Sequence, residues 1–173
     1  MAAIKNILVT GANGQLGSEL SVLAPSFPQY NFFFASKEEL SIANETSVKQ
    51  YFAANNIDCC INCAAYTAVD NAEKEREAAF AANALAPGYL AATCKEHNAL
   101  LIHFSTDYVF AGDSRAPYNE EDATAPLNYY GETKLEGEKA ALQNNDTTIV
   151  IRTSWVYSSF GKNFVKTMIR LMT

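Results

Sequence analysis

The chain has 173 residues, and its length, hydrophobic content and charge limit what it can be. Hydrophobic residues make up 49% of it, enough for one well-buried core, and the length is too short for two ordinary domains. Thirteen Lys and Arg stand against nineteen Asp and Glu, a net charge of −6 without a basic run, so we expect no nucleic-acid partner. No apolar stretch approaches the roughly 20 residues that span a bilayer, and no signal peptide is recognisable, so we expect no membrane partner and a cytoplasmic location.

Apolar, β-branched runs alternate along the chain with stretches of helical period. This alternation predicts an α/β fold, a Rossmann-type doubly wound parallel sheet with helices on both faces, in a single domain. We predict strands over 4–10, 31–36, 58–62, 99–105 and 148–153, and a turn-rich surface loop over 108–128. Helices are predicted from the first glycine-rich turn to near Pro25, with Leu16, Leu20 and Leu23 on one side, and over 45–55, 72–97 with a kink near Pro87, 129–143 and 163–172.

A glycine-rich segment, GANGQLG over residues 11–17, lies directly between the first strand and the first helix. Gly11 permits a tight turn, Gly14 lets the backbone approach a pyrophosphate, and Gly17 lets helix and strand pack closely. The N–H groups and the dipole of the helix N-terminus face the anion. The segment therefore predicts a dinucleotide site, although glycines also occur in loops only because they need positive φ.

The end of the second strand normally carries an acid that binds the adenosine ribose, about 20 residues after the glycines. Here that position is Ala35 or Ser36, followed by Lys37. Without a carboxylate, Ser36 and Lys37 could accept a 2′-phosphate, which favours NADPH or the use of both cofactors. An ordinary surface lysine explains Lys37 equally well.

Tyr130 and Lys134 are four residues apart in a predicted helix and so share one face. A cation close to a phenol lowers its pKa from about 10, which suits a tyrosine that exchanges a proton at neutral pH. The fourth strand ends with Ser105, Thr106 and Asp107 at the sheet edge where such folds bind ligands. Their hydroxyls could instead satisfy backbone groups, and Asp107 could contact substrate or cap the next turn.

The cysteines and histidines suggest no further chemistry. Cys59, Cys60, Cys63 and Cys94 are too few for a disulfide scaffold, and we expect reduced, buried thiols and no metal site. His97 and His103 stand alone in the sequence and receive no role.

These motifs together resemble the extended branch of the short-chain dehydrogenase/reductase superfamily. Four runs narrow the resemblance to the dTDP-4-dehydrorhamnose reductase family: NCAAYTAVD (62–70), STDYVF (105–110), RTSWVY (152–157) and GKNFVKTM (161–168). The resemblance covers the whole chain. It implies reduction of the C4 ketone of dTDP-4-dehydro-β-L-rhamnose to dTDP-L-rhamnose with NADPH or NADH, for cell-surface polysaccharide, and leaves a homodimer and a magnesium requirement of the full-length family open.

The resemblance also implies roles for individual residues. Tyr130 would be the proton donor, Lys134 would bind the nicotinamide ribose and lower the pKa of the tyrosine, and Thr106 would hydrogen-bond the keto oxygen. Asn83 matches an asparagine that orders a water near the lysine. The predicted substrate-facing residues are Val69, Thr106, Asp107, Tyr108 and Trp155. The predicted cofactor-binding residues are Gly11, Asn13, Gly14, Gln15, Leu16, Gly17, Ser36, Lys37, Ser41, Ile42, Ala64, Ala65, Tyr66, Thr67, Tyr130 and Lys134.

Two departures from the family pattern and two alternative functions accompany this interpretation. Leu40-Ser41-Ile42 stands where the family often has Leu-Asp-Ile near the adenine. Family members continue into a smaller substrate-binding domain, so we expect residues 1–173 to be the NAD(P)-binding domain, able to bind cofactor and inactive on substrate.

The alternatives are another nucleotide-sugar epimerase or dehydratase, and a non-catalytic subunit like the methionine adenosyltransferase β subunit. The absence of a glutamate after Thr106-Asp107 disfavours a dehydratase, and the intact Tyr130, Lys134 and Thr106 disfavour the subunit.

Overall fold

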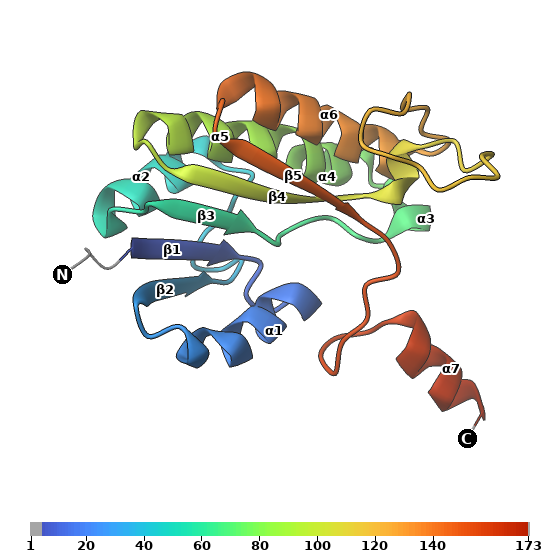
Figure 1. The fold of residues 1–173 in the computed structure, drawn as a ribbon, viewed down its shortest axis with the longest axis horizontal. Helices are drawn as coiled ribbons and strands as arrows, with labels where there is room; N and C mark the ends of the chain where they lie inside the picture. Colours follow the sequence, from blue (N-terminus) through green and yellow to red (C-terminus); the bar gives the residue numbers. More distant parts are fainter. Residues whose placement is uncertain (1–4, 173) are drawn as a thin grey trace.

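The strands form one parallel sheet with the order β2-β1-β3-β4-β5 (Figure 1). The computed structural model describes residues 5–172. The strands are β1 (Lys5–Thr10), β2 (Tyr30–Ala35), β3 (Cys59–Asn62), β4 (Leu100–Thr106) and β5 (Thr148–Thr153). The chain moves outward from β1 to β2, then returns and moves the other way through β3 to β5. This reversal between β1 and β3 is where open α/β sheets bind ligands, beyond the carboxyl ends of the strands.

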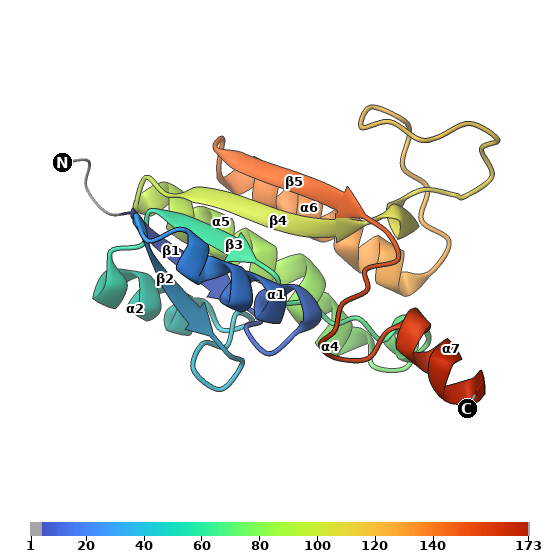
Figure 2. The same cartoon turned by 60° about the horizontal axis from the view of Figure 1, so that its bottom comes forward.

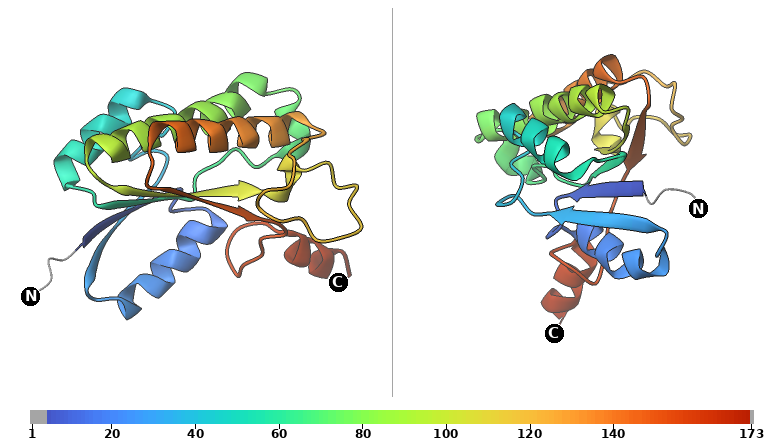
Figure 3. Two further views of the ribbon diagram at one scale, coloured as in Figure 1. Left: turned by 45° about the horizontal axis from the view of Figure 1, so that its top comes forward. Right: turned by 90° about the vertical axis from the view of Figure 1, so that its left-hand side faces the viewer.

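Helices cover both faces of the sheet, as the alternating pattern predicts (Figure 3). The helix α1 (Gln15–Leu23) lies on one face, and α2 (Glu45–Asn55), α5 (Ala86–Glu96) and α6 (Tyr129–Asn144) lie on the other. The main apolar core lies under the second group, where Leu8, Cys60 and Leu101 of the strands pack with residues of these helices. The predicted leucine face of α1 is only partly used, because Leu23 is 50% exposed.

The predicted helix over 72–97 is confirmed over 76–96, with the predicted interruption near Pro87, and is wrong over 73–75. The chain forms two short helices, α3 (Val69–Ala72) and α4 (Arg76–Phe80), then a π-helical turn, η2 (Ala81–Leu85), before α5. Pro87 has no N–H to donate to the fourth residue before it, so a regular α-helix cannot continue through this point. The wide turn just before the proline absorbs the disruption and gives Asn83 its orientation.

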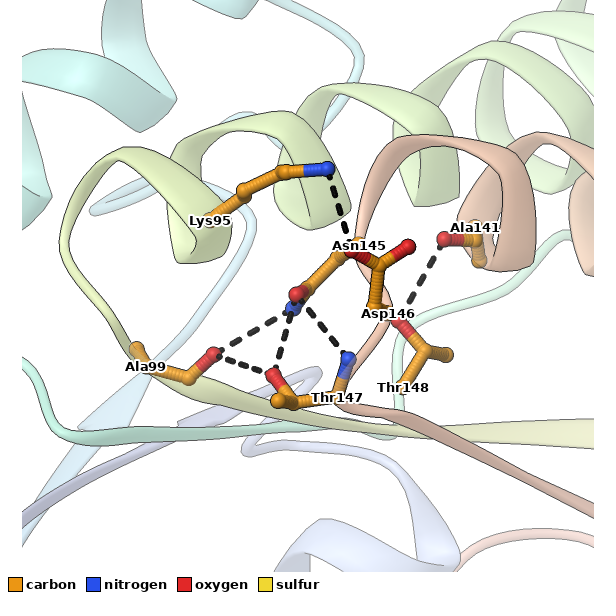
Figure 4. Close-up of polar contacts among 7 residues, drawn as sticks. All are labelled: Lys95, Ala99, Ala141, Asn145, Asp146, Thr147 and Thr148. Atoms are coloured by element: carbon orange, nitrogen blue, oxygen red, sulfur yellow. Dashed lines mark hydrogen bonds and ion pairs between the residues drawn. The ribbon is translucent and has the colours of Figure 1, made fainter.

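A hydrogen-bonded turn joins the end of α6 to the start of β5 and β4 (Figure 4). The buried Asn145 donates from its side-chain amide to the carbonyl of Ala99, and its Oδ1 accepts from the N–H and the hydroxyl of Thr147. Thr148 bonds back to the carbonyl of Ala141. These contacts fix α6 relative to β4, and therefore fix the height of every side chain that α6 directs at the sheet.

The last helix, α7 (Phe164–Met172), lies away from the sheet (Figures 1 and 2). Asn163 caps it by accepting from the N–H of Lys166. Its apolar residues are exposed, including Phe164 at 55% and Leu171 at 71%. Within residues 5–172, no helix is both long and apolar enough to cross a membrane.

Candidate active site

The glycine loop wraps closely around the start of α1. Gly11 has φ of +65°, and a Cβ there would lie 2.7 Å from the backbone nitrogen of Ala64. A Cβ at Gly17 would collide with the carbonyl oxygen of Gly11. Gly14 is the N-cap of α1 and offers no side-chain cap, so the first N–H groups of the helix remain available to an anion. The segment after β3 and the glycine loop, both predicted to bind cofactor, are therefore brought into contact.

Loop 158–163 returns to the start of α1 and contacts Gln15, its first residue. Asn163 donates from its side-chain amide to Oε1 of Gln15 at 2.9 Å, across 148 residues of sequence. A Cβ at Gly161 would lie 2.9 Å from Cγ of Gln15. Sequence reasoning missed both contacts, since nothing local in the GKNF run indicates its partner.

The sequence predicts no carboxylate at the end of β2, where the adenosine ribose would bind, but the structure places one there. The backbone N–H of Ser36 donates to Oε2 of Glu39 at 2.8 Å, so a carboxylate does lie at the end of β2. Glu39 was missed because it stands three residues beyond the usual position. Lys37 is exposed, and Ile42 is buried in the main core.

The segment Ala64–Thr67 is held by Asn83 from the π-helical turn. Oδ1 of the buried Asn83 accepts from the N–H of Tyr66 at 2.9 Å, and Nδ2 donates to the carbonyl of Tyr66 and to Oγ1 of Thr133. One side chain thus joins the loop after β3 to α6, between Tyr130 and Lys134. The suggested role of Asn83 in ordering a water stays a prediction.

Tyr130 and Lys134 project from α6 toward the end of β4. Tyr130 is 9% exposed and Lys134 is 2% exposed. Nζ of Lys134 donates to the carbonyl of Phe104 at 2.6 Å. The hydroxyl of Thr106 donates to Oδ1 of Asp107 at 3.1 Å and accepts from the N–H of Tyr108. Thr106, and not Asp107, therefore caps the short helix η3 (Asp107–Val109), which corrects the capping alternative for Asp107.

The ionisable groups of this cluster are shifted mainly by burial. Burial raises the pKa of Tyr130 and the charge of Asp107 raises it further, while the nearby hydroxyl of Thr106 acts in the opposite direction. Burial lowers the pKa of Lys134 to about 8, against the opposite effect of Glu138. The predicted lowering of the tyrosine pKa is therefore not the net result in this structure, where the ammonium bonds the Phe104 carbonyl.

Glu138 and Arg152 form a partly buried ion pair one helical turn beyond Lys134. Nη2 of Arg152 lies 2.7 Å from Oε2 of Glu138, and Nε lies 3.0 Å from Oε1, a bidentate arrangement. Glu138 is 3% exposed, and the guanidinium lies 4.9 Å from the ring centre of Phe110. Sequence reasoning missed this pair, whose partners come from α6 and β5.

The predicted substrate-facing residues divide into two groups. Tyr108 packs edge-on against Tyr130 with ring centres 5.6 Å apart, and Val69 packs beside the cluster that contains Tyr130. Trp155 is 73% exposed, has φ of +51°, and contacts Phe164 at the start of α7. The structure thus brings Tyr108 and Val69 to the tyrosine and joins Trp155 to the last helix.

The cysteines are free, in agreement with the expected reduced thiols. Burial raises the pKa of Cys59 to about 11 and that of Cys63 to about 12, so these thiols stay protonated and unreactive at neutral pH. Among the described residues, no group of three His, Cys, Asp or Glu could hold a metal ion.

A five-stranded parallel sheet, a glycine loop at its switch point and a buried Tyr-x-x-x-Lys pair at the end of β4 define a Rossmann-type domain of the short-chain dehydrogenase/reductase class. Residues 5–173 match the family described as RmlD substrate binding domain, and the chain belongs to that family.

Known relatives are similar over nearly the whole chain. A dTDP-4-dehydrorhamnose reductase of Salmonella typhimurium is 45% identical over 168 residues, which are 96% of this chain and 56% of the relative. Among solved structures, the dTDP-4-dehydrorhamnose reductase of Clostridium acetobutylicum has a TM-score of 0.93 at 40% identity, covering 96% of this chain and 59% of that one. The same enzyme of Bacillus anthracis, in complex with NADP, has a TM-score of 0.93 at 41% identity, covering 97% and 59%. The chain spans about half the length of the curated relatives it matches.

Proposed function

We propose that this chain is the NAD(P)-binding domain of a reductase that converts the C4 ketone of dTDP-4-dehydro-β-L-rhamnose to the alcohol of dTDP-L-rhamnose. The observation that carries the proposal is the buried Tyr130–Thr106 pair at the carboxyl end of β4, with Lys134 one turn away. It is supported by relatives at 41–45% identity that are named dTDP-4-dehydrorhamnose reductases. The relatives' remaining length would supply most of the substrate-binding surface.

The glycine loop fits a pyridine nucleotide. Its close approach to Ala64 leaves no room for a Cβ at Gly11, and the uncapped N-terminus of α1 offers N–H groups to a pyrophosphate. The solved relative from Bacillus anthracis, 41% identical, carries NADP. When bound, the reduced nucleotide supplies the hydride that is added to C4.

The protein's own residues would act on the oxygen of the ketone. Negative charge develops on that oxygen during reduction, so donors fixed there act mainly in the transition state. The phenol of Tyr130 would donate the proton, and the hydroxyl of Thr106 would donate a second hydrogen bond. To do so, Thr106 must give up its present bond to Asp107. Lys134 would leave the Phe104 carbonyl to bind the ribose and hold positive charge near the phenol.

The test compares the 173-residue chain with a chimera in which the C-terminal remainder of the Salmonella typhimurium relative is joined to it. Each is incubated with the dTDP-keto sugar and with NADPH or NADH, and the loss of reduced nicotinamide is followed by absorbance. We expect both proteins to bind the nucleotide and only the chimera to oxidise it. A chimera that binds both ligands without turnover would refute the proposal, and sedimentation of the same samples would test for a homodimer.

Replacing Tyr130 with Phe in the active chimera removes the proton donor and leaves the ring packing against Tyr108 intact. A positioned general acid contributes about 10²–10⁴ in rate, so kcat should fall by that factor. Tyr129→Phe, the neighbouring tyrosine on the same helix, is the matched control and should keep its activity. Unchanged kcat in the Tyr130 variant would remove the phenol from the mechanism.

A further inference from the structure

A row of buried polar side chains crosses the sheet on the face covered by α5 and α6. Thr10, Asn62 and His103 occupy paired positions on β1, β3 and β4, and each is 1% exposed. They lie two residues beyond Leu8, Cys60 and Leu101 of the core, so they point to the same face. Buried polar groups are costly unless each is hydrogen-bonded, so the end of this row requires a partner.

The hydrogen bonds of the row fix the tautomer of His103. Oδ1 of Asn62 accepts from the hydroxyl of Thr10 at 2.7 Å and from the N–H of Ala64 at 3.2 Å, so the amide NH₂ faces the imidazole. Nδ2 of Asn62 lies 3.0 Å from Nδ1 of His103, and Nδ1 is therefore the acceptor. The proton of the neutral ring stands on Nε2. Burial, with a smaller effect of the Lys134 charge, keeps the pKa of His103 well below its usual value, so the ring is neutral at pH 7.

Two buried polar atoms on β4 have no partner among the described residues, Nε2 of His103 and Oγ of Ser105. Ser105 is 5% exposed and lies two residues along the strand, on the same face as His103. Nζ of Lys134 reaches the same stretch of β4, since it donates to the carbonyl of the intervening Phe104 at 2.6 Å and its charge acts on His103. An ammonium carries three N–H donors, so this bond leaves two for other acceptors. Two unpaired polar atoms of β4 and the buried ammonium of α6 thus come from the same short stretch between these two elements.

We propose that His103, Ser105 and Lys134 bind a buried water molecule. Its oxygen accepts from Nε2–H of His103 and from Nζ–H of Lys134, and one of its hydrogens is donated to Oγ of Ser105. Proteins hold about one buried water per ~27 residues, typically with about three hydrogen bonds to groups otherwise unpaired, as here. The water site stands without the proposed function. The proposed function adds that His103 is a positioning residue, which steadies the ammonium of Lys134 from the side opposite to a bound nucleotide.

The charged and ionisable groups around this site come from two elements. Glu138 of α6 acts directly on Lys134 and raises its pKa, against the lowering by burial. Tyr130 of α6 and Asp107, after β4, belong to the neighbouring cluster. None of these supplies an acceptor to Nε2–H of His103, for which the described chain offers no bond.

The test is nitrogen-15 NMR of the histidine rings in the 173-residue chain. The chain has two histidines, and His97→Gln assigns the signals. We expect the His103 nitrogens to keep the Nε2–H pattern from pH 6 to 8, and the Nε2 proton to show a cross-relaxation peak to a long-lived water. An Nδ1–H pattern, or an Nε2–H signal with no water contact, would overturn the proposal.

A variant series separates the water from the fold. Ser105→Ala removes the water's acceptor with little loss of volume, and should abolish the water peak or shorten the water's lifetime at least tenfold. In the same variant the pKa of Lys134, followed by its side-chain carbon-13 shifts, should fall below about 8, since the ammonium loses hydration. Ser26→Ala, an exposed serine, is the control and should change neither signal. A water peak and a lysine midpoint that are both unchanged in Ser105→Ala would show that no such water is held. Because neither readout uses turnover, failure here is distinguishable from failure of the proposed reaction.

Discussion

Lys134 would need its positive charge for the proposed reaction, but it is buried, and burial disfavours the charged form. Burial lowers its pKa from 10.5 to about 8, and its ammonium donates a hydrogen bond to the Phe104 carbonyl. Between pH 8 and 10.5 the folded chain therefore holds fewer protons than the unfolded chain. The free energy of unfolding must then rise with pH across that window. Below pH 8 the buried ammonium destabilises the folded chain by its full amount.

Replacing Lys134 with Met should stabilise the chain at pH 7 by on the order of 2–3 kcal/mol, since the methionine fills a similar volume without charge. The difference from wild type should disappear as the pH approaches 10.5. Urea unfolding at several pH values measures it, and Lys139→Met, an exposed lysine on the same helix, should change little. In exchange, the methionine variant should bind NADPH more weakly. A variant less stable than wild type at pH 7 would contradict the argument.

Glu39 bears on the choice between the two nicotinamide cofactors. Its carboxylate lies 2.8 Å from the N–H of Ser36, where a 2′-phosphate would have to fit beside Lys37. Glu39→Gln should increase the affinity for NADPH by up to about fivefold, because an exposed charge pair contributes up to about 1 kcal/mol, and should leave NADH nearly unchanged. Titration by protein fluorescence measures both, with Glu121→Gln, an exposed acid in the loop before α6, as the control. Equal changes for the two nucleotides would separate Glu39 from the phosphate.

At this scale the sequence predicts the residues whose spacing is local and misses those whose partners are remote. Tyr130 and Lys134 follow from a four-residue interval on one helix, and Gly11 from its place after a strand. Glu138 meets Arg152, and Asn83 meets Tyr66, only after the chain folds. His103 received no role in the sequence analysis because the groups that surround its ring, Asn62 and Lys134, come from β3 and α6.

Among the elements, α5, η2 and α6 pack closely against one another. A Cβ at Gly137 of α6 would collide with the carbonyl oxygen of Asn83 in η2, and would lie 3.1 Å from Cγ of Pro87. Gly88 of α5 lies on the same interface, but a Cβ there would meet only side chains, the Cβ of Ala140 at 3.3 Å and Nδ2 of Asn144 at 3.8 Å. The two glycines therefore differ in what an added methyl group would displace, backbone in one case and a side chain in the other.

Gly137→Ala should destabilise the chain by about 1–3 kcal/mol despite the better helix propensity of alanine, because the backbone of η2 must move. Gly88→Ala, the matched control, should be close to neutral or stabilising by up to about 1 kcal/mol. Chemical denaturation of both variants measures the difference. Since Asn83 also holds Tyr66, the Gly137 variant should weaken nucleotide binding as well, whereas equal stability of the two variants would refute the close approach.

Helices and strands with a clear local hydrophobic pattern are predicted correctly from the sequence. The bounds of α2 and β5 are predicted as observed, because a capped amphipathic run and a bounded β-branched run are strong local signals. The alanine-rich stretch before Pro87 is helical by composition, but composition does not record the π-helical turn. That turn depends on tertiary contacts of Asn83 with the loop after β3 and with α6.

For the whole molecule, nucleotide binding and stability are linked. A ligand that binds only the folded chain adds about 2.7 kcal/mol at 100 times its Kd. For a chain of this size that corresponds to a rise of about 5–10 °C in Tm. We therefore expect NADPH to raise the Tm of the 173-residue chain, measured by circular dichroism, with inorganic phosphate at equal concentration as the control. The same Tm with both additions would mean that the glycine loop needs the relatives' remaining length to bind.

The position of β5 at the border of the sheet carries a further consequence for handling this molecule. The backbone of β5 pairs with β4 on one side only. Its other side presents a row of backbone N–H and C=O groups with which a strand of a second copy could pair. Proteins discourage such growth with prolines or outward charges, and the one charged residue of β5, Arg152, is already engaged by Glu138. We expect a lysine in place of the exposed Ile149 to add charge repulsion between copies that meet along this edge.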